Sequence, residues 1–136
     1  MDRALVERKL ESLERCMSRI ASKNPVSSSE LAEDYDSQDI IAVNLERAVQ
    51  SCLDIAVHLL ATGRLPLPSS SAEAFRNLAT EGILPQPLAE RMAMAVGLRN
   101  PAVHEYSRLD WEQIHDYLPR ALADLREFAA SVSGRL

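Results

Sequence analysis

Residues 36–63 read DSQDIIAVNLERAVQSCLDIAVHLLATG, and this stretch decides the fold class. Its apolar residues recur every three or four positions, the spacing that places side chains on one face of an α-helix. These residues are Ile41, Leu45, Ala48, Cys52, Ile55 and Leu59. Asp36 or Ser37 can cap the start of such a helix, while Gly63 with Pro66 beyond it can end it. The stretch therefore predicts one long helix with a continuous buried face.

The same periodicity predicts further helices on both sides of this stretch. They cover about 6–20, 70–82, 87–96 and 110–132, and a polar link spans about 24–36. Two of them begin at capping boxes, Ser70 with Glu73 and Asp110 with Gln113. Pro119 falls inside the last pattern, so we expect that helix to be kinked or split there. No segment alternates with period two. The sequence predicts an all-α fold, an antiparallel bundle of four main helices plus a short one.

Length, charge and cysteine usage limit the function classes. A chain of 136 residues fits a single domain, 1–136, that is large enough to bury a core. A net charge of −5 argues against broad, non-specific nucleic-acid binding, so any nucleic-acid site needs a local arginine cluster. No apolar run is long enough to span a membrane, and the charged N-terminus does not resemble a signal peptide. We expect a cytoplasmic protein without a cofactor, in which Cys16 and Cys52 are reduced core thiols rather than a disulfide.

A polar stripe follows a second face of the long helix. Its members step by three and four: Asn44, Arg47, Ser51, Asp54 and His58. A solvated face explains such a stripe, but its short hydrogen-bonding side chains also suit the wall of a cleft. Asp54 and His58 are one turn apart and can pair. No third ligand of suitable spacing accompanies them, so we predict no metal site. His115 is interpreted as a surface or interface residue.

Residues 98–106, LRNPAVHEY, combine a permanent cation, a titratable imidazole and a phenol. Arg99 is a planar fork of donors that suits phosphate and stays charged at any relevant pH. His104 can give and take a proton near neutrality. These two side chains can act on a phosphoryl centre without a metal. Tyr106 lies two residues beyond His104 and can accept a modifying group.

The spacing of the two catalytic candidates raises a geometric problem. On a regular helix, residues five apart point about 140° away from each other. Pro101 disturbs the helix further. Either a kink brings Arg99 and His104 together, or a second molecule completes the site. A two-fold dimer that apposes the motifs supplies two of each side chain. Apolar or mixed side chains near the motif are expected to favour such a dimer: Leu109, Trp111 and Ile114.

The pattern Arg99-x4-His104-x-Tyr106, with Asn100 after the arginine, resembles the signature of the HepT toxins of the HEPN superfamily. Three further segments are similar to that family: RAVQSCLDIA at 47–56, AFRNLA at 74–79 leading into GIL, and MAVGLRN at 94–100. The resemblance implies an all-helical homodimer that acts as a ribonuclease toxin on an RNA substrate. Its antitoxin in such pairs is a minimal nucleotidyltransferase (MNT), which silences the toxin by adding AMP to the motif tyrosine, here Tyr106. Asn100, Arg47 and Asp54 are predicted to support Arg99 and His104.

Two other interpretations remain open from the residues alone. The chain could be a non-catalytic helical subunit that binds a nucleotidyltransferase, because Arg99 binds phosphate and Tyr106 stacks whether or not a bond is cut. It could also be a structural bundle in which His104 and Tyr106 are ordinary interface residues. The resemblance favours the ribonuclease toxin over both.

Overall fold

The computed structural model describes residues 1–98 and 110–136, and these residues form helices joined by short connections. The helices are α1 (Arg3–Lys23), α2 (Ser28–Glu33), α3 (Tyr35–Thr62), α4 (Ser71–Thr80), α5 (Gln86–Ala95), the 3-10 helix η1 (Val96–Leu98) and α7 (Trp111–Ser133). No strand occurs in the described part of the chain. The predicted all-α class is therefore confirmed.

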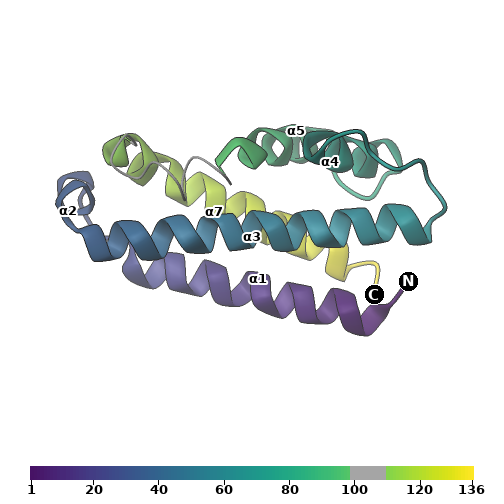
Figure 1. Cartoon of the computed structure of the whole chain (residues 1–136), viewed down its shortest axis with the longest axis horizontal. Coiled ribbons are helices and arrows are strands. Elements are labelled where there is room, and N and C mark those ends of the chain that lie inside the picture. Colours follow the sequence, from purple (N-terminus) through teal and green to yellow (C-terminus); the bar gives the residue numbers. More distant parts are fainter. Residues whose placement is uncertain (99–109) are drawn as a thin grey trace.

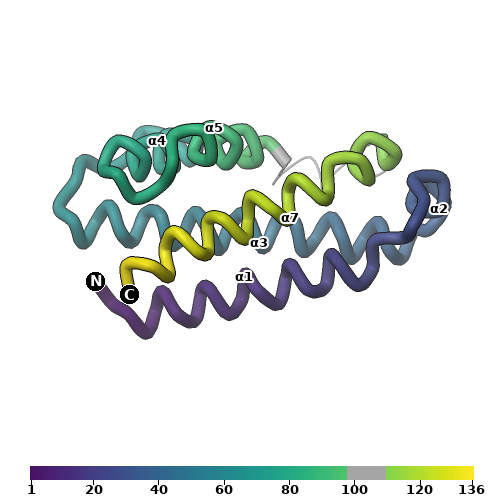
Figure 2. Tube along the Cα trace, turned by 180° about the vertical axis from the view of Figure 1, so that it is seen from behind, coloured from purple at the N-terminus to yellow at the C-terminus, as the bar shows by residue number. Residues whose placement is uncertain are grey.

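Helix α3 is the longest and lies at the centre of the bundle (Figure 1). Helix α1 runs antiparallel along one side of it, α4 and α5 cover the other side, and α7 crosses obliquely over the face seen in Figure 2. The directions of α1, α3, α5 and α7 alternate, so the predicted antiparallel arrangement is also confirmed. The largest fully buried side chains come from every layer, and they include Leu13, Ile20, Leu31, Ile41, Ile55, Phe75, Leu88 and Phe128.

The segment between α1 and α3 differs from its prediction. The expected polar link contains the short helix α2, in which Ser27 Oγ accepts a hydrogen bond from the backbone N–H of Glu30 at 3.2 Å. Leu31 from this helix is fully buried. One buried residue in six is too little for a periodic signal, and the Ser27–Glu30 cap was the available sign. Helix α3 also begins earlier than expected, because Asp34 rather than Asp36 or Ser37 caps it.

Pro119 does not split the last helix, which runs unbroken from Trp111 to Ser133. A proline removes one N–H donor, so the only carbonyl that loses its helical partner is that of His115. Pro119 is exposed, and water can satisfy that carbonyl. The loss is local, while the apolar face of α7 continues through Leu118 and Leu122 into the core.

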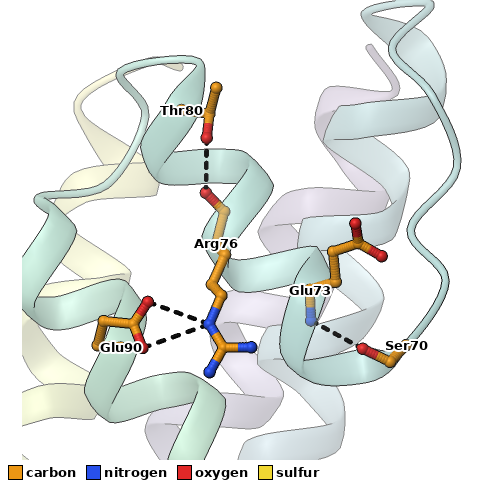
Figure 3. Close-up of polar contacts among 5 residues, drawn as sticks. All are labelled: Ser70, Glu73, Arg76, Thr80 and Glu90. Atoms are coloured by element: carbon orange, nitrogen blue, oxygen red, sulfur yellow. Dashed lines mark hydrogen bonds and ion pairs between the residues drawn. The ribbon is translucent and has the colours of Figure 1, made fainter.

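Helices α4 and α5 pack against each other as a hairpin, and polar contacts of Ser70, Glu73, Arg76 and Glu90 hold it (Figure 3). The expected cap is present: Ser70 Oγ accepts from the backbone N–H of Glu73 at 3.1 Å. The Glu73 carboxylate turns back to the N–H and hydroxyl of Ser69, which lowers its pKa. Arg76 Nε lies 3.0 Å from Glu90 Oε1 and joins the two helices. Phe75 packs edge-on against Phe128 with ring centroids 5.9 Å apart, which fixes the hairpin on α7.

Candidate active site

The predicted catalytic motif connects the hairpin to α7. Arg99, Asn100, His104 and Tyr106 fall within 99–109, outside the described residues. The described chain shows how the two ends of this segment are held. Helix η1 ends at Leu98 and contacts α3. On the other side Asp110 caps α7, accepting from the backbone N–H groups of Glu112 and Gln113 at 3.1 and 3.2 Å, as the sequence predicts.

The apolar surface that the sequence predicts beside the motif is not formed by Trp111 and Ile114, and Leu109 lies outside the described residues. Trp111 is only 6% exposed and belongs to the core of its own chain, and Ile114 is partly buried against that core. Neither presents a free apolar face, because the start of α7 turns both inward. Met94 is 78% exposed at the end of α5 instead. Met92, two residues earlier, is buried.

The polar stripe on α3 is divided between solvent and the α1 side: Arg47 is exposed, whereas Asp54 and His58 have partners on the α1 side. Asp54 Oδ2 lies 2.8 Å from Lys9 Nζ, and its Oδ1 accepts from Gln50 Nε2 at 2.8 Å. The backbone N–H of Asp2 donates to His58 Nε2 at 3.0 Å. The expected Asp54–His58 pair is therefore wrong, because α1 supplies a partner to each residue. Both contacts tie the start of α1 to the second half of α3.

Further along the same seam, α1 and α3 enclose an open groove of about 620 Å³. We call it the arginine groove, because Arg15 and Arg19 of α1 and Arg47 of α3 line it. Its other lining residues are Ser12, Cys16, Asp39, Ile40, Val43 and Asn44. Asn44 is 7% exposed and donates from Nδ2 to the carbonyl of Ile40 at 2.8 Å. The suggestion that the stripe forms the wall of a cleft is confirmed for Asn44 and Arg47, while Arg15 and Arg19 were missed.

The two cysteines lie near one another, and both are free and buried, as predicted; only Cys16 lines the groove. Burial raises the pKa of Cys16, although Arg47 and Arg15 act in the opposite direction. Burial also raises the pKa of Cys52 well above its usual range. Both thiols are therefore protonated at neutral pH and do not serve as nucleophiles.

His115 has a structural contact, in agreement with its assignment away from catalysis. Its Nε2 lies 2.8 Å from the carbonyl oxygen of Pro25 and joins α7 to the turn after α1. Within 1–98 and 110–136, no three His, Cys, Asp or Glu side chains gather closely enough to hold a metal ion. None of the helices in those ranges is long and apolar enough to cross a membrane.

Fold and sequence together define the class, a small antiparallel helical bundle of the HEPN type whose α5 and α7 are joined by the Arg-x4-His-x-Tyr segment. The family model described as "Ribonuclease HepT-like" matches residues 7–132. The chain belongs to this family.

Relatives of known name agree with this assignment. The mRNA nuclease HepT of Shewanella oneidensis is 32% identical over 124 residues, which cover 91% of this chain and 92% of that protein. The tRNA nuclease HepT of Aphanizomenon flos-aquae is 26% identical over 132 residues, covering 97% and 90%. A solved structure of the tri-AMPylated Shewanella oneidensis HEPN toxin in complex with MNT antitoxin superposes with a TM-score of 0.89 at 30% identity, covering 98% and 99%.

Proposed function

We propose that this protein is the ribonuclease toxin of a toxin–antitoxin pair. The observation that carries the proposal is the family match over residues 7–132 together with the Arg99-x4-His104-x-Tyr106 pattern in this chain. Relatives that cover nine-tenths of the chain carry the names mRNA nuclease and tRNA nuclease. The substrate class is therefore RNA, and the reaction is cleavage of a phosphodiester bond.

The motif supplies the groups that this reaction needs without a metal. A base removes the proton of the ribose 2′-OH, whose oxygen attacks the adjacent phosphorus. An acid protonates the departing 5′-oxygen, and a cation stabilises the charge on the phosphorane. His104 provides the acid–base chemistry, and the Arg99 guanidinium binds the phosphoryl oxygens. The products are a 2′,3′-cyclic phosphate and a free 5′-hydroxyl.

Cleavage is expected to persist in excess EDTA and to leave 2′,3′-cyclic phosphate ends. The reason is that imidazole and guanidinium perform the proton transfer and charge stabilisation that a metal would otherwise supply. Incubation of purified protein with total RNA, followed by mapping of the fragment ends, measures both. A strict requirement for Mg²⁺ would contradict the mechanism. Absence of cleavage, combined with stable binding to a nucleotidyltransferase, would instead favour the non-catalytic binding subunit.

We infer that the active species is a homodimer that apposes the two motifs. One chain carries one Arg99 and one His104, five positions apart, whereas a two-fold axis brings two of each to one cleft. One histidine then serves as the base and its copy as the acid. Asn100 is retained as a proposed supporting residue. Asp54 pairs with Lys9 and Arg47 lines the arginine groove, both on the α1 side of α3, so neither is assigned to Arg99 or His104.

A shared cleft predicts a non-linear response to an inactive subunit. After exchange of subunits in an equal mixture of wild-type and His104→Ala chains, random pairing leaves about one quarter of the dimers with both histidines. Activity is expected to fall to about that fraction of the wild-type value, by the same pairing rule. Independent protomers would retain half. Sedimentation of the wild-type protein should give a dimer, and a monomer at micromolar concentration would exclude the shared cleft.

The proposed partner is a minimal nucleotidyltransferase that adds AMP to Tyr106. The similar Shewanella oneidensis toxin was solved as a tri-AMPylated protein in complex with its MNT antitoxin, which supports this pairing. A phenol two residues beyond the catalytic histidine places the adduct beside the proposed catalytic groups. Phosphodiester charge competes with RNA for Arg99, and the nucleoside restricts access to His104.

A further inference from the structure

The arginine groove gathers three guanidinium groups that have no partner among the residues that the structure describes. Arg15, Arg19 and Arg47 form no side-chain hydrogen bond or ion pair with any residue of the described chain. The contrast within α1 is clear. Arg3 forms an ion pair with Glu7, one turn later, at 2.9 Å. Arg15 forms no ion pair with Glu11, which lies one turn before it. Arg15 lines the groove instead.

The antiparallel register of α1 and α3 brings these residues together. Lys9 meets Asp54 near one end of the seam, and Asp2 meets His58 beyond it. Further along both helices from these contacts, Cys16 of α1 lies opposite Asn44 and Arg47 of α3. Arg15 and Arg19, on either side of Cys16, line the groove together with these residues. No single helix reveals the cluster, because Arg47 belongs to a different segment of the sequence.

The three arginine side chains are exposed at the groove, so water weakens their mutual repulsion, and an anion that enters the groove meets all three of them. Three like charges around one space repel each other, and the chain as a whole has a net charge of −5, so carboxylates are available elsewhere. The single carboxylate in the groove, Asp39, forms no ion pair with any of the three arginines. Guanidinium forks match phosphate oxygens geometrically and lose less hydration than an ammonium group does.

We propose that the arginine groove binds the sugar–phosphate backbone of the RNA strand, away from the bond that is cut. This inference rests on the proposed function, since RNA is its substrate. The groove follows the α1 side of α3, whereas α5 and η1, which lead to the motif, lie on the opposite side of α3 (Figures 1 and 2). A strand that reaches both must pass around one helix, whose diameter is ~10 Å. The groove thereby gives an acidic protein a local binding surface for a polyanion. Because the arginines contact phosphates and not bases, binding in the groove has no sequence preference.

The test is the salt dependence of RNA binding. The probe is a fluorescein-labelled oligouridylate, and the background is His104→Ala, which keeps the probe intact. Each phosphate contact on a single strand contributes ~0.7 to the slope of log affinity against log salt. Replacing Arg15, Arg19 and Arg47 together by alanine is expected to reduce that slope by about 2. In wild-type background the same triple variant should raise KM for RNA far more than it lowers kcat.

A matched control carries the same net charge. Arg3, Arg64 and Arg126 are exposed arginines outside the groove, and replacing all three by alanine also changes the net charge from −5 to −8. The control is expected to keep the wild-type slope. Circular dichroism confirms that both triple variants are folded, and single Arg47→Gln, Arg15→Gln and Arg19→Gln variants should each lose about a third of the effect.

Each alternative outcome has a definite meaning. Equal loss of slope in groove and control variants would show that only overall charge matters, and would overturn the proposal. A groove variant that binds RNA normally but no longer dimerises or binds the nucleotidyltransferase would reassign the groove to a protein partner. If wild-type protein cleaves RNA and the groove variant matches it in KM and slope, only this inference fails. If wild-type protein neither binds nor cleaves RNA, the proposed function fails with it.

Discussion

His104→Ala is expected to slow RNA cleavage by ~10²–10⁴-fold, the usual cost of removing a general acid–base group. Because the proposed cleft uses both copies of His104, the variant loses the base and the acid together. The effect should appear in kcat rather than in KM, because the imidazole transfers protons during the chemical step and does not hold the bound strand. Single-turnover cleavage of a labelled RNA measures it, and relief of growth inhibition on expression provides the cellular counterpart.

The other two histidines of the chain are the matched controls. His58 accepts a hydrogen bond from the Asp2 backbone, and His115 contacts the Pro25 carbonyl, so both have structural partners. Their alanine variants are expected to cleave RNA at the wild-type rate. A His115→Ala variant as slow as His104→Ala would move the acid–base role to α7.

Arg99→Lys separates charge from shape at the same site. Lysine keeps the positive charge but loses the planar fork that holds two phosphoryl oxygens at once. The variant is therefore also expected to be impaired. Wild-type activity in Arg99→Lys would mean that a point charge suffices, and would remove bidentate contact from the mechanism.

The helices were predictable from the sequence because the apolar residues of each buried face recur at helical spacing within one segment. The apolar residues chosen for the long helix are buried or packed against the core, and Ser70, Asp110 and Gly63 mark ends where they were expected. The errors occurred where a segment is too short to show a period, as in α2, or where a local rule is weaker than the packing around it. The split at Pro119 is such a case, since one lost hydrogen bond does not outweigh the continuous apolar face of α7.

The site was less predictable, because its contacts join residues that are far apart in the sequence. The polar stripe on α3 was visible, but its partners Lys9 and Asp2 depend on the register between two helices. The same register explains why Arg47 was recognised and Arg15 and Arg19 were not. Trp111 was expected beside the motif as a dimer contact, but it is 6% exposed because it belongs to the buried apolar face of α7.

Tyr106→Phe is expected to release the toxin from its antitoxin. The variant loses only the phenolic oxygen that receives the nucleotidyl group, so catalysis by Arg99 and His104 should continue. Co-expression with a minimal nucleotidyltransferase encoded beside this chain, followed by intact-mass measurement, should show whole AMP units on the wild-type toxin. Those increments should vanish in Tyr106→Phe, which should remain toxic although its antitoxin is active.

The chain contains two further tyrosines, and they make the assignment specific. Tyr35 is 76% exposed at the start of α3, so accessibility alone would make it the better acceptor. Tyr117 is half-buried, and burial together with Asp124 raises its pKa, which keeps the phenol protonated. Tyr35→Phe and Tyr117→Phe are expected to be modified and neutralised like the wild type. Loss of the adduct in Tyr35→Phe would show that exposure selects the acceptor. Neutralisation of Tyr106→Phe without any adduct would show that the antitoxin acts by binding alone, because an inhibitor that needs no covalent bond leaves the phenol without a role.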